Sequence, residues 1–209
     1  MSNSEQSRRS QPKGDKRERT RAKLLEAARS LIREKGFEQT TLEEIAERAG
    51  MTTGAIYGNF KNRDDLFIAL GHAYWRPIVP KVKTPTSFAE IMRAMAEATI
   101  RAIPERSTAA VGRLTGLAYA LTHEELRSRV KKVTAESYAF GEQWLQSATE
   151  GEDLPMPADQ LVAVIHVLTE GLVIQRLLTP ELVPDEVIRS AFAALARNST
   201  KEPTKVPKH

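Results

Sequence analysis

Apolar residues recur at three- and four-residue intervals along most of this chain of 209 residues. The first stripe consists of Leu24, Ala27, Ala28, Leu31 and Ile32, which fall on one face of an amphipathic helix. No segment alternates apolar and polar residues as a half-buried strand does, and no hairpin dipeptide joins two apolar runs. The sequence therefore predicts an all-α fold of about nine helices.

Four helices are predicted in the first third of the chain. The sequence Thr41-Leu-Glu-Glu44 is a capping box, in which the Thr41 hydroxyl accepts a bond from the backbone of Glu44 and the Glu44 carboxylate reaches back. Thr52 or Thr53 can cap the third helix, and Asn62 can cap the fourth. The predicted ranges are 15–35, 42–49, 53–59 and 62–76.

A linker at 79–85 precedes the later helices, which begin at prolines or at a second capping box. That box, Thr122-His-Glu-Glu125, predicts a long helix that extends to about Glu150. The helix after Pro157 is apolar on nearly every side, so it needs extensive cover. The predicted starts of these helices lie near Pro85, Pro104, Thr122, Pro157 and Pro184.

The residue types argue against several classes of protein. The chain has no Cys, and its four His residues are spread between positions 72 and 209, so neither disulfides nor a zinc site is expected. Residues 85–197 show no Ser/His/Asp order, Gly-rich phosphate loop or metal-ligand spacing. We therefore expect no enzyme, no metal and no cofactor.

The hydropathy of the chain argues against a membrane partner. No run approaches the roughly 18 to 20 consecutive apolar residues of a membrane span. Residues 1–13 lack the apolar segment of a signal peptide. A cytoplasmic location is expected.

Positive charge is concentrated at the N-terminal end. Residues 1–63 contain 14 Lys and Arg against 9 Asp and Glu, whereas residues 64–209 contain 17 against 18. A basic first third on a near-neutral remainder indicates an anionic partner for that end only, with nucleic acid favoured over a membrane surface.

The helices predicted at 42–49 and 53–59 have the spacing of a helix-turn-helix, whose second helix enters the major groove of DNA. From Gly50 to Arg63 there is no carboxylate, although the chain as a whole is 28% charged. A carboxylate there would repel phosphate. The spacing alone leaves an alternative open, because such helix pairs also occur in bundles that never bind DNA.

The residues from Thr41 to Leu66, TLEEIAERAGMTTGAIYGNFKNRDDL, resemble the DNA-binding signature of TetR-family transcriptional regulators. The resemblance extends back to Arg19 and covers about 50 residues. It implies double-stranded operator DNA as a partner, a divergent helical regulatory domain, and repression as the better guess for the sign of regulation.

The resemblance also assigns DNA contacts. Thr52, Thr53, Gly54 and Ala55 are expected to face the groove, Tyr57 and Asn59 to contact phosphate or base, and Lys61 and Thr41 to contact phosphate. The sequence departs from many family members at Gly58 and Asn59, where a bulkier residue followed by His or Tyr is common. One contact with the DNA backbone is therefore expected to differ.

These features predict four regions. Residues 1–14 form a disordered basic arm, and residues 15–62 form the helix-turn-helix domain. Residues 63–197 form a regulatory domain for ligand binding and dimerisation, beginning with a connecting helix at 63–77. Residues 198–209 form a disordered tail.

The two closing helices carry more apolar residues than one subunit can cover, which predicts a homodimer with a four-helix interface. The family resemblance implies the same interface. The predicted interface residues are Ile165, Leu168, Leu172, Val187, Ala191, Phe192 and Leu195.

The regulatory domain also carries adaptable and aromatic side chains that suit a cavity for a small, largely hydrophobic effector. Ordinary core packing is the alternative for each residue, and control by a protein partner is the alternative for the function. The predicted ligand-binding residues are Phe88, Met92, Met95, Leu117, Phe140 and Trp144, with Arg113, His166 and Gln175 as polar contacts.

Overall fold

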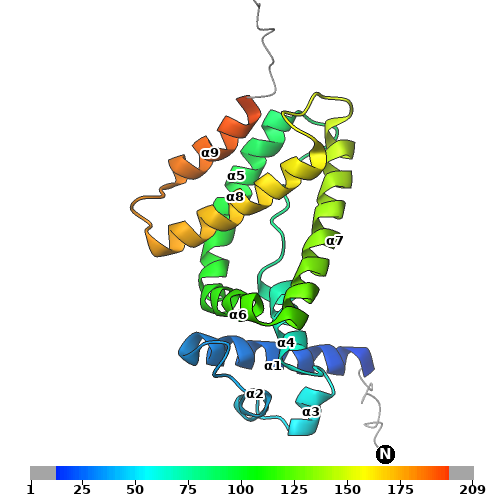
Figure 1. The fold of residues 1–209 in the computed structure, drawn as a ribbon, viewed down its shortest axis with the longest axis vertical. Helices are drawn as coiled ribbons and strands as arrows, with labels where there is room; N and C mark the ends of the chain where they lie inside the picture. The colour runs from blue at the N-terminus through cyan, green and yellow to red at the C-terminus, as the bar shows by residue number, and fades with distance from the viewer. Residues whose placement is uncertain (1–12, 198–209) are drawn as a thin grey trace, which may run out of the picture. The chain divides into compact units, whose positions relative to one another are not determined.

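The computed structural model describes residues 13–197, with side chains from residue 16 onward. The described residues form nine helices and no strand, which confirms the all-α prediction (Figure 1). The helices are α1 (Lys13–Lys35), α2 (Leu42–Arg48), α3 (Thr53–Tyr57), α4 (Arg63–Tyr74), α5 (Phe88–Ser107), α6 (Ala110–Thr122), α7 (Glu124–Thr149), α8 (Ala158–Leu178) and α9 (Asp185–Arg197).

Two predicted helix starts are wrong. Pro104 does not open a helix but lies near the end of α5, which continues to Ser107. Thr122 does not cap α7, because it is the last residue of α6 and only His123 separates the two helices. His123 occupies the N-cap position and makes no side-chain capping bond.

The predicted arm at 1–14 and the predicted tail at 198–209 fall almost entirely outside the described residues. Lys13 and Gly14 are the exception, since they form the first residues of α1. The first helix therefore begins two residues before its predicted start.

The described chain divides into two compact units. Unit 1 contains the residues up to Ala73 together with Val111–Tyr119, and unit 2 contains the residues from Tyr74 to Ala110 and from Ala120 onward. The predicted boundary at 62/63 therefore differs from this division, because most of α4 and the middle of α6 belong to unit 1.

Unit 1 packs α1 on α2 and α2 on α3 (Figure 1). The Phe37 ring makes T-shaped contacts with the rings of Phe67 and Tyr119, and each pair of ring centroids is 5.4 Å apart. Gly116 permits the close approach of Phe67, since a Cβ atom there would lie 2.0 Å from Cε2 of that ring. The largest fully buried side chains of unit 1 are Phe37, Phe60, Leu24, Ile32, Ile45, Ile56 and Leu66.

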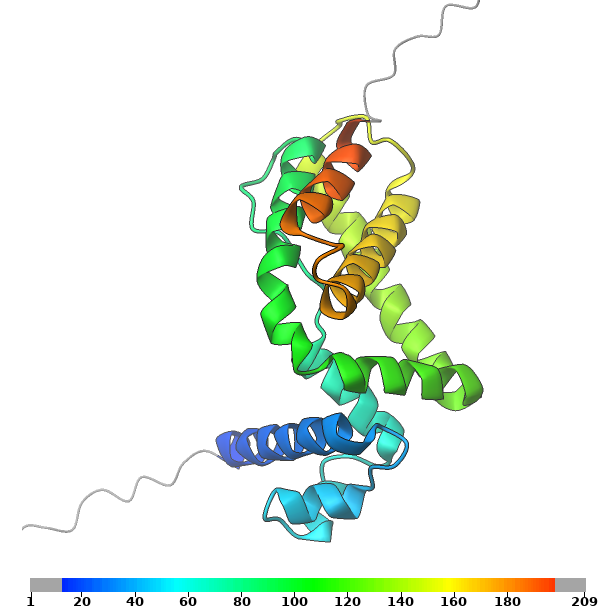
Figure 2. The same ribbon diagram turned by 90° about the vertical axis from the view of Figure 1, so that its left-hand side faces the viewer.

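Unit 2 is built around α5, against which both α8 and α9 pack, and α7 packs on α8 (Figure 2). Its core contains side chains from α5, α7, α8 and α9. Its fully buried members are Phe88, Ile91, Met92, Leu161, Ile188 and Phe192.

A polar cluster lies at the start of unit 2. The indole N–H of Trp75 donates to Glu170 on α8 at 2.6 Å. The buried guanidinium of Arg106 lies over the Trp75 ring at 4.5 Å and donates to the carbonyl oxygen of Arg76. These contacts hold Trp75 and Arg76, which follow α4, against α5 and α8. They also supply the partners that the buried charge of Arg106 requires.

Candidate nucleic-acid interface

The start of α2 is fixed by the predicted capping box. The Thr41 hydroxyl accepts from the backbone N–H of Glu44 at 3.3 Å, and the Thr41 N–H donates to the Glu44 carboxylate at 2.9 Å. Gly50 then turns the chain with a φ of +65°, in the left-handed region that glycine tolerates. The predicted helix-turn-helix connection is confirmed.

Helix α3 is capped by Thr52, whose hydroxyl accepts from the backbone N–H of Ala55 at 3.2 Å. Of the two predicted caps, Thr52 is therefore the one used. Ile56 is the only buried residue of this five-residue helix, while Thr53 and Gly54 are exposed. The helix presents small, uncharged groups to solvent over most of its surface, as close approach to base edges requires.

Tyr57 is the large side chain on this surface, and 49% of it is exposed. Its hydroxyl donates to Oε1 of Glu43 at 2.7 Å. This bond raises the pKa of the Tyr57 phenol and, with backbone hydrogen bonding, lowers the pKa of the Glu43 carboxyl. The phenol therefore already has an anionic acceptor where DNA contact is predicted.

Asn59 is half-buried, and its Nδ2 donates to the carbonyl oxygen of Ala55 at 2.8 Å. Its Oδ1 atom is buried without a hydrogen-bond partner. The amide is thus folded back over the end of α3 instead of projecting outward. The predicted contact of Asn59 with DNA would have to break or share this bond.

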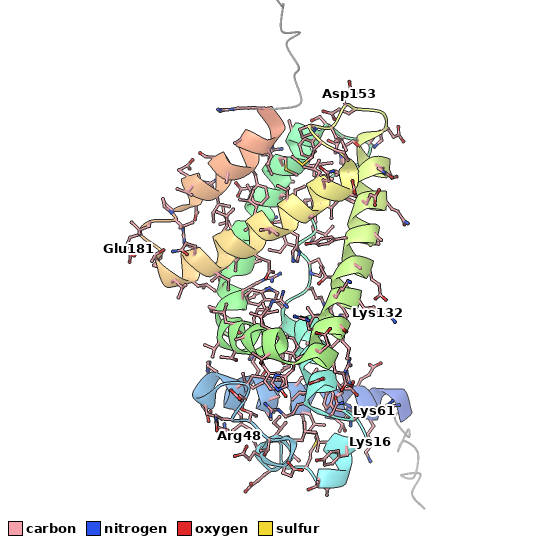
Figure 3. All side chains as sticks on the ribbon, viewed as in Figure 1. Lys16, Arg48, Lys61, Lys132, Asp153 and Glu181 are labelled. Atoms are coloured by element: carbon pink, nitrogen blue, oxygen red, sulfur yellow. The ribbon has the colours of Figure 1, made fainter. Side chains whose placement is uncertain are left out.

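Lys61 follows α3 and is exposed (Figure 3). Its backbone N–H donates to the Asp65 carboxylate at 3.0 Å. Arg63 is placed differently. Its guanidinium donates to the carbonyl oxygens of Phe37 and Glu38, each at 3.0 Å, and lies 5.1 Å from the Phe37 ring centroid. Lys61 is available for the predicted phosphate contact, whereas Arg63 supports the fold of unit 1.

Arg21 is a functional candidate that sequence reasoning missed. Its guanidinium donates to the carbonyl oxygen of Asn59 at 3.1 Å and lies 4.5 Å from the centroid of the Phe60 ring. These contacts hold the segment after α3 against α1. Because 38 residues separate Arg21 from Asn59, no local pattern could have revealed the pair.

Two other cations near α2 are paired. Lys35 bonds Glu44 at 2.5 Å, and this bond and those from Thr41 lower the pKa of Glu44 to about 2. Arg48 bonds Glu34 at 2.8 Å, and this bond together with one from Ser30 lowers the pKa of Glu34 to about 2. Part of the positive charge of unit 1 is therefore matched within the protein.

The nine predicted ligand-binding residues are divided between the two units. Arg113 and Leu117 belong to unit 1, and the other seven belong to unit 2. Phe88, Met92 and Met95 are buried in the unit 2 core, and Trp144 packs on that core. These four residues pack in or on the core, and their role in ligand binding stays a prediction.

The remaining three predicted ligand-binding residues lie outside the buried core of unit 2. Phe140 is 63% exposed, and Gln175 is exposed with its amide donating to the Thr179 hydroxyl at 2.9 Å. His166 is half-buried, with its ring 5.3 Å from the Tyr138 centroid. Gln175 is therefore wrong as a polar group inside a cavity, since it faces solvent at the end of α8.

The predicted interface residues differ in their exposure. Phe192 is wrong as an interface residue, because it is 0% exposed within one chain and belongs to the unit 2 core. Ile165, Leu168, Leu172 and Leu195 are half-buried against the same core. Ala191 is half-buried and Val187 is exposed.

Sequence reasoning missed the apolar residues that α8 exposes most. Val164, Val167 and Leu178 lie at helical spacing and are 37%, 66% and 65% exposed. By length and composition α8 could also cross a membrane, and only 17% of its most apolar stretch is buried. The face is visible in the spacing from 164 to 178, but its exposure depends on how α8 packs.

Comparisons with known proteins place the helix-turn-helix in a family. Residues 24–70 match the model described as "Bacterial regulatory proteins, tetR family". The transcriptional regulator TtgR of Pseudomonas putida is 49% identical over 51 residues, which are 24% of this chain and 24% of TtgR. The chain thus matches about a quarter of that relative's length.

Solved structures extend the similarity to the whole fold. NalD, the secondary repressor of the MexAB-OprM multidrug efflux pump in Pseudomonas aeruginosa, superposes with a TM-score of 0.58 at 23% identity, over 87% of this chain and 95% of NalD. The SmeT–triclosan complex superposes with a TM-score of 0.56 at 19% identity, over 91% and 98% of the two chains.

Proposed function

We propose that this chain, which belongs to the tetR family of bacterial regulatory proteins, is a cytoplasmic transcriptional repressor that binds operator DNA as a homodimer. A small, largely hydrophobic effector releases it. The observation that carries the proposal is the exposed surface of α3, whose own residues include no carboxylate. Both α2 and α3 are capped at their N-termini by threonine side chains. Enzymatic activity is not part of the function, since the family consists of DNA-binding regulators.

The DNA contacts are proposed for the residues that remain available on this surface. Thr53, Gly54 and Ala55 approach base edges, while Lys61 and the start of α2 at Thr41 approach phosphates. Lys16, Arg17 and Lys23 on α1 are exposed and add to the positive charge of unit 1. Together these groups supply both base readout and phosphate attraction.

The homodimer is proposed through α8 and α9. One recognition helix reads few base pairs, and two-fold dimers gain affinity by spanning half-sites about 34 to 36 Å apart. The exposed apolar residues of α8, together with the exposed Val187 on α9, supply the apolar surface proposed for this pairing.

The test of DNA binding is selection from a random duplex library with the purified full chain. We expect enrichment of a two-fold symmetric sequence with half-sites about one helical turn apart, and steep loss of affinity between about 50 and 200 mM salt. Binding without enrichment, or a flat salt response, would refute sequence-specific repression.

The effector is proposed from the half-buried aromatic and polar side chains of unit 2, which include Tyr138, Trp144 and His166. The structural neighbour bound to triclosan supports the same chemical class for this chain. A thermal-shift screen that begins with triclosan identifies binders, which are then added to the protein–operator complex. An effector should weaken operator binding by about 5- to 150-fold. If no apolar compound does so, control by a protein partner becomes the better account.

A further inference from the structure

We propose that Glu43 is a positioning residue that holds the Tyr57 hydroxyl away from DNA phosphates and so weakens binding to any duplex. The inference rests on the proposed function, because it concerns the same DNA-facing surface. It assigns a restraining role to a residue outside the expected set of DNA contacts.

The geometry joins the two helices of the helix-turn-helix at their exposed surfaces. Glu43 lies in the first turn of α2 and is exposed. Tyr57 is the last residue of α3, and its hydroxyl donates to Oε1 of Glu43 at 2.7 Å. A phenol carries a single hydrogen, so this bond leaves none to donate to a phosphate oxygen.

The hydrogen-bond partners of Glu43 differ from those of the neighbouring carboxylates. The carboxylates of Glu34 and Glu44 each bond a cation, Arg48 and Lys35 respectively. The hydrogen bonds that lower the pKa of Glu43 come from Tyr57 and from the backbone, and neither carries a positive charge. Glu43 therefore remains ionised at neutral pH and places a negative charge beside α3.

Two effects then act against DNA. The carboxylate repels any phosphate that approaches within a Debye length, which is about 10 Å at 0.1 M salt. It also competes with phosphate for the phenol hydrogen, since both are anionic acceptors. Neither effect depends on base sequence, so both weaken binding to specific and nonspecific duplexes alike.

A purely structural role for the bond gives the opposite result. If the bond only fastened α3 to α2, its weakening would loosen the recognition helix and lower DNA affinity. If Glu43 restrains binding, removal of its charge raises affinity. The sign of the change separates the two roles.

The experiment measures the affinity of the full chain and its Glu43→Gln variant for two labelled duplexes of about 30 base pairs, one of random sequence and one selected by the wild type. Gln keeps an oxygen that accepts from the phenol but removes the charge. We expect Glu43→Gln to bind both duplexes about fivefold more tightly at about 50 mM salt and about twofold more tightly at about 200 mM, with unchanged preference between them.

A second pair of variants tests whether the gain passes through the phenol. In the wild type, Tyr57→Phe should change affinity less than about twofold, because the hydroxyl is held by Glu43. In the Glu43→Gln background the same change should remove most of the gain, since phosphate is a stronger acceptor than a neutral amide.

Glu47→Gln is the matched control, because it removes the same charge from an exposed position of α2. It should raise affinity by less than half as much as Glu43→Gln and leave the titration of the Tyr57 phenol unchanged by NMR. Glu43→Gln should instead lower the pKa of that phenol toward its ordinary value.

The outcomes are distinct. A wild type that binds neither duplex overturns the proposed function. A wild type that binds while Glu43→Gln binds equally or more weakly overturns the role of Glu43 alone. Equal gains from Glu43→Gln and Glu47→Gln reduce the effect to net charge and also overturn it.

Discussion

Helices α3 and α8 both bury few of their residues, but they expose different chemistry. Helix α3 has five residues, with only Ile56 buried and small polar groups outside. Helix α8 has 21 residues and exposes two valines and a leucine, Val164, Val167 and Leu178. An exposed polar surface without carboxylates suits phosphate and base edges, whereas an exposed apolar face suits another protein surface. The contrast is consistent with the proposed DNA-reading surface in unit 1 and the proposed subunit interface in unit 2.

The two helices are also supported differently. Helix α3 is too short to be stable by itself, and it depends on its Thr52 cap and on contacts such as those of Arg21. Helix α8 is long, and Leu161, Thr169 and Val173 bury its inner side. A change on the outer face of α8 should therefore spare the fold, while a change in the contacts around α3 should affect the fold and DNA binding together.

The largest expected effect comes from a charge on the exposed face of α8. Val167→Glu should weaken dimerisation at least about 100-fold, because an unpaired charge would be buried between subunits. The monomer fold should persist, since Val167 is 66% exposed. Analytical ultracentrifugation measures the association, and circular dichroism measures the fold.

Val79→Glu serves as the control for this change, because Val79 is similarly apolar and exposed but lies outside α8 and α9. It should leave the dimer intact. Phe192→Asp should instead unfold unit 2, since that ring is buried in its core. If Val167→Glu dimerised as tightly as the wild type, the exposed face of α8 would not be the subunit interface, and the contrast with α3 would fail.

The next effect concerns the contact that holds the end of α3. Arg21→Ala removes a cation–π contact and a hydrogen bond, so we expect a loss of about 1 to 2 kcal/mol in the stability of unit 1. Operator affinity should fall about tenfold. Denaturant unfolding and DNA titration measure the two effects.

Lys23→Ala is the matched control for Arg21→Ala, since Lys23 is an exposed cation of the same helix. It should lower DNA affinity by loss of charge but leave unfolding unchanged. Equal behaviour of the two variants would mean that Arg21 contributes charge alone.

A smaller effect separates phosphate contact from base reading. Lys61→Ala should weaken binding to all duplexes alike and reduce the slope of log affinity against log salt by about 0.9. Thr53→Ala should change the preference among operator variants. Titrations against a panel of single-base variants compare them, and a sequence-dependent loss for Lys61→Ala would contradict its assignment.

The smallest expected effect is the acid sensitivity of the exposed ion pairs around α2. The pKa of Glu34 and of Glu44 is lowered to about 2 in the folded protein, from an ordinary value of 4.5. A lowered folded-state pKa contributes stability above the ordinary value, and this contribution is lost as pH falls from about 4.5 toward 2. The thermal unfolding temperature should decline over that range.

Glu44→Gln tests the acid effect, because it removes one titrating carboxyl while an amide can still bond Thr41. Its unfolding temperature should depend less on pH between about 4.5 and 2 than that of the wild type. An identical pH dependence would show that the capping carboxylate contributes nothing to acid sensitivity.

Local sequence was enough to predict the helix-turn-helix and most of its boundaries. The capping box at Thr41 and the turn at Gly50 each involve residues within a few positions of one another, so spacing reveals them. The failures have local causes as well, since Pro104 and Thr122 carry start signals that the neighbouring helices override. The predicted ligand-binding set stays a prediction, because an apolar stripe does not distinguish a packed core from a cavity lining.

The sequence by itself determined the helical fold, the caps of α2 and α3 and the absence of carboxylates from Gly50 to Arg63, because these depend on short-range hydrogen bonds and residue type. Only the tertiary structure decided that Phe192 is core while Val167 is surface, that Arg21 fastens the segment after α3, and that Glu43 holds Tyr57. Each of these depends on which side chains distant in sequence meet after packing, and helical periodicity identifies a face without naming what covers it.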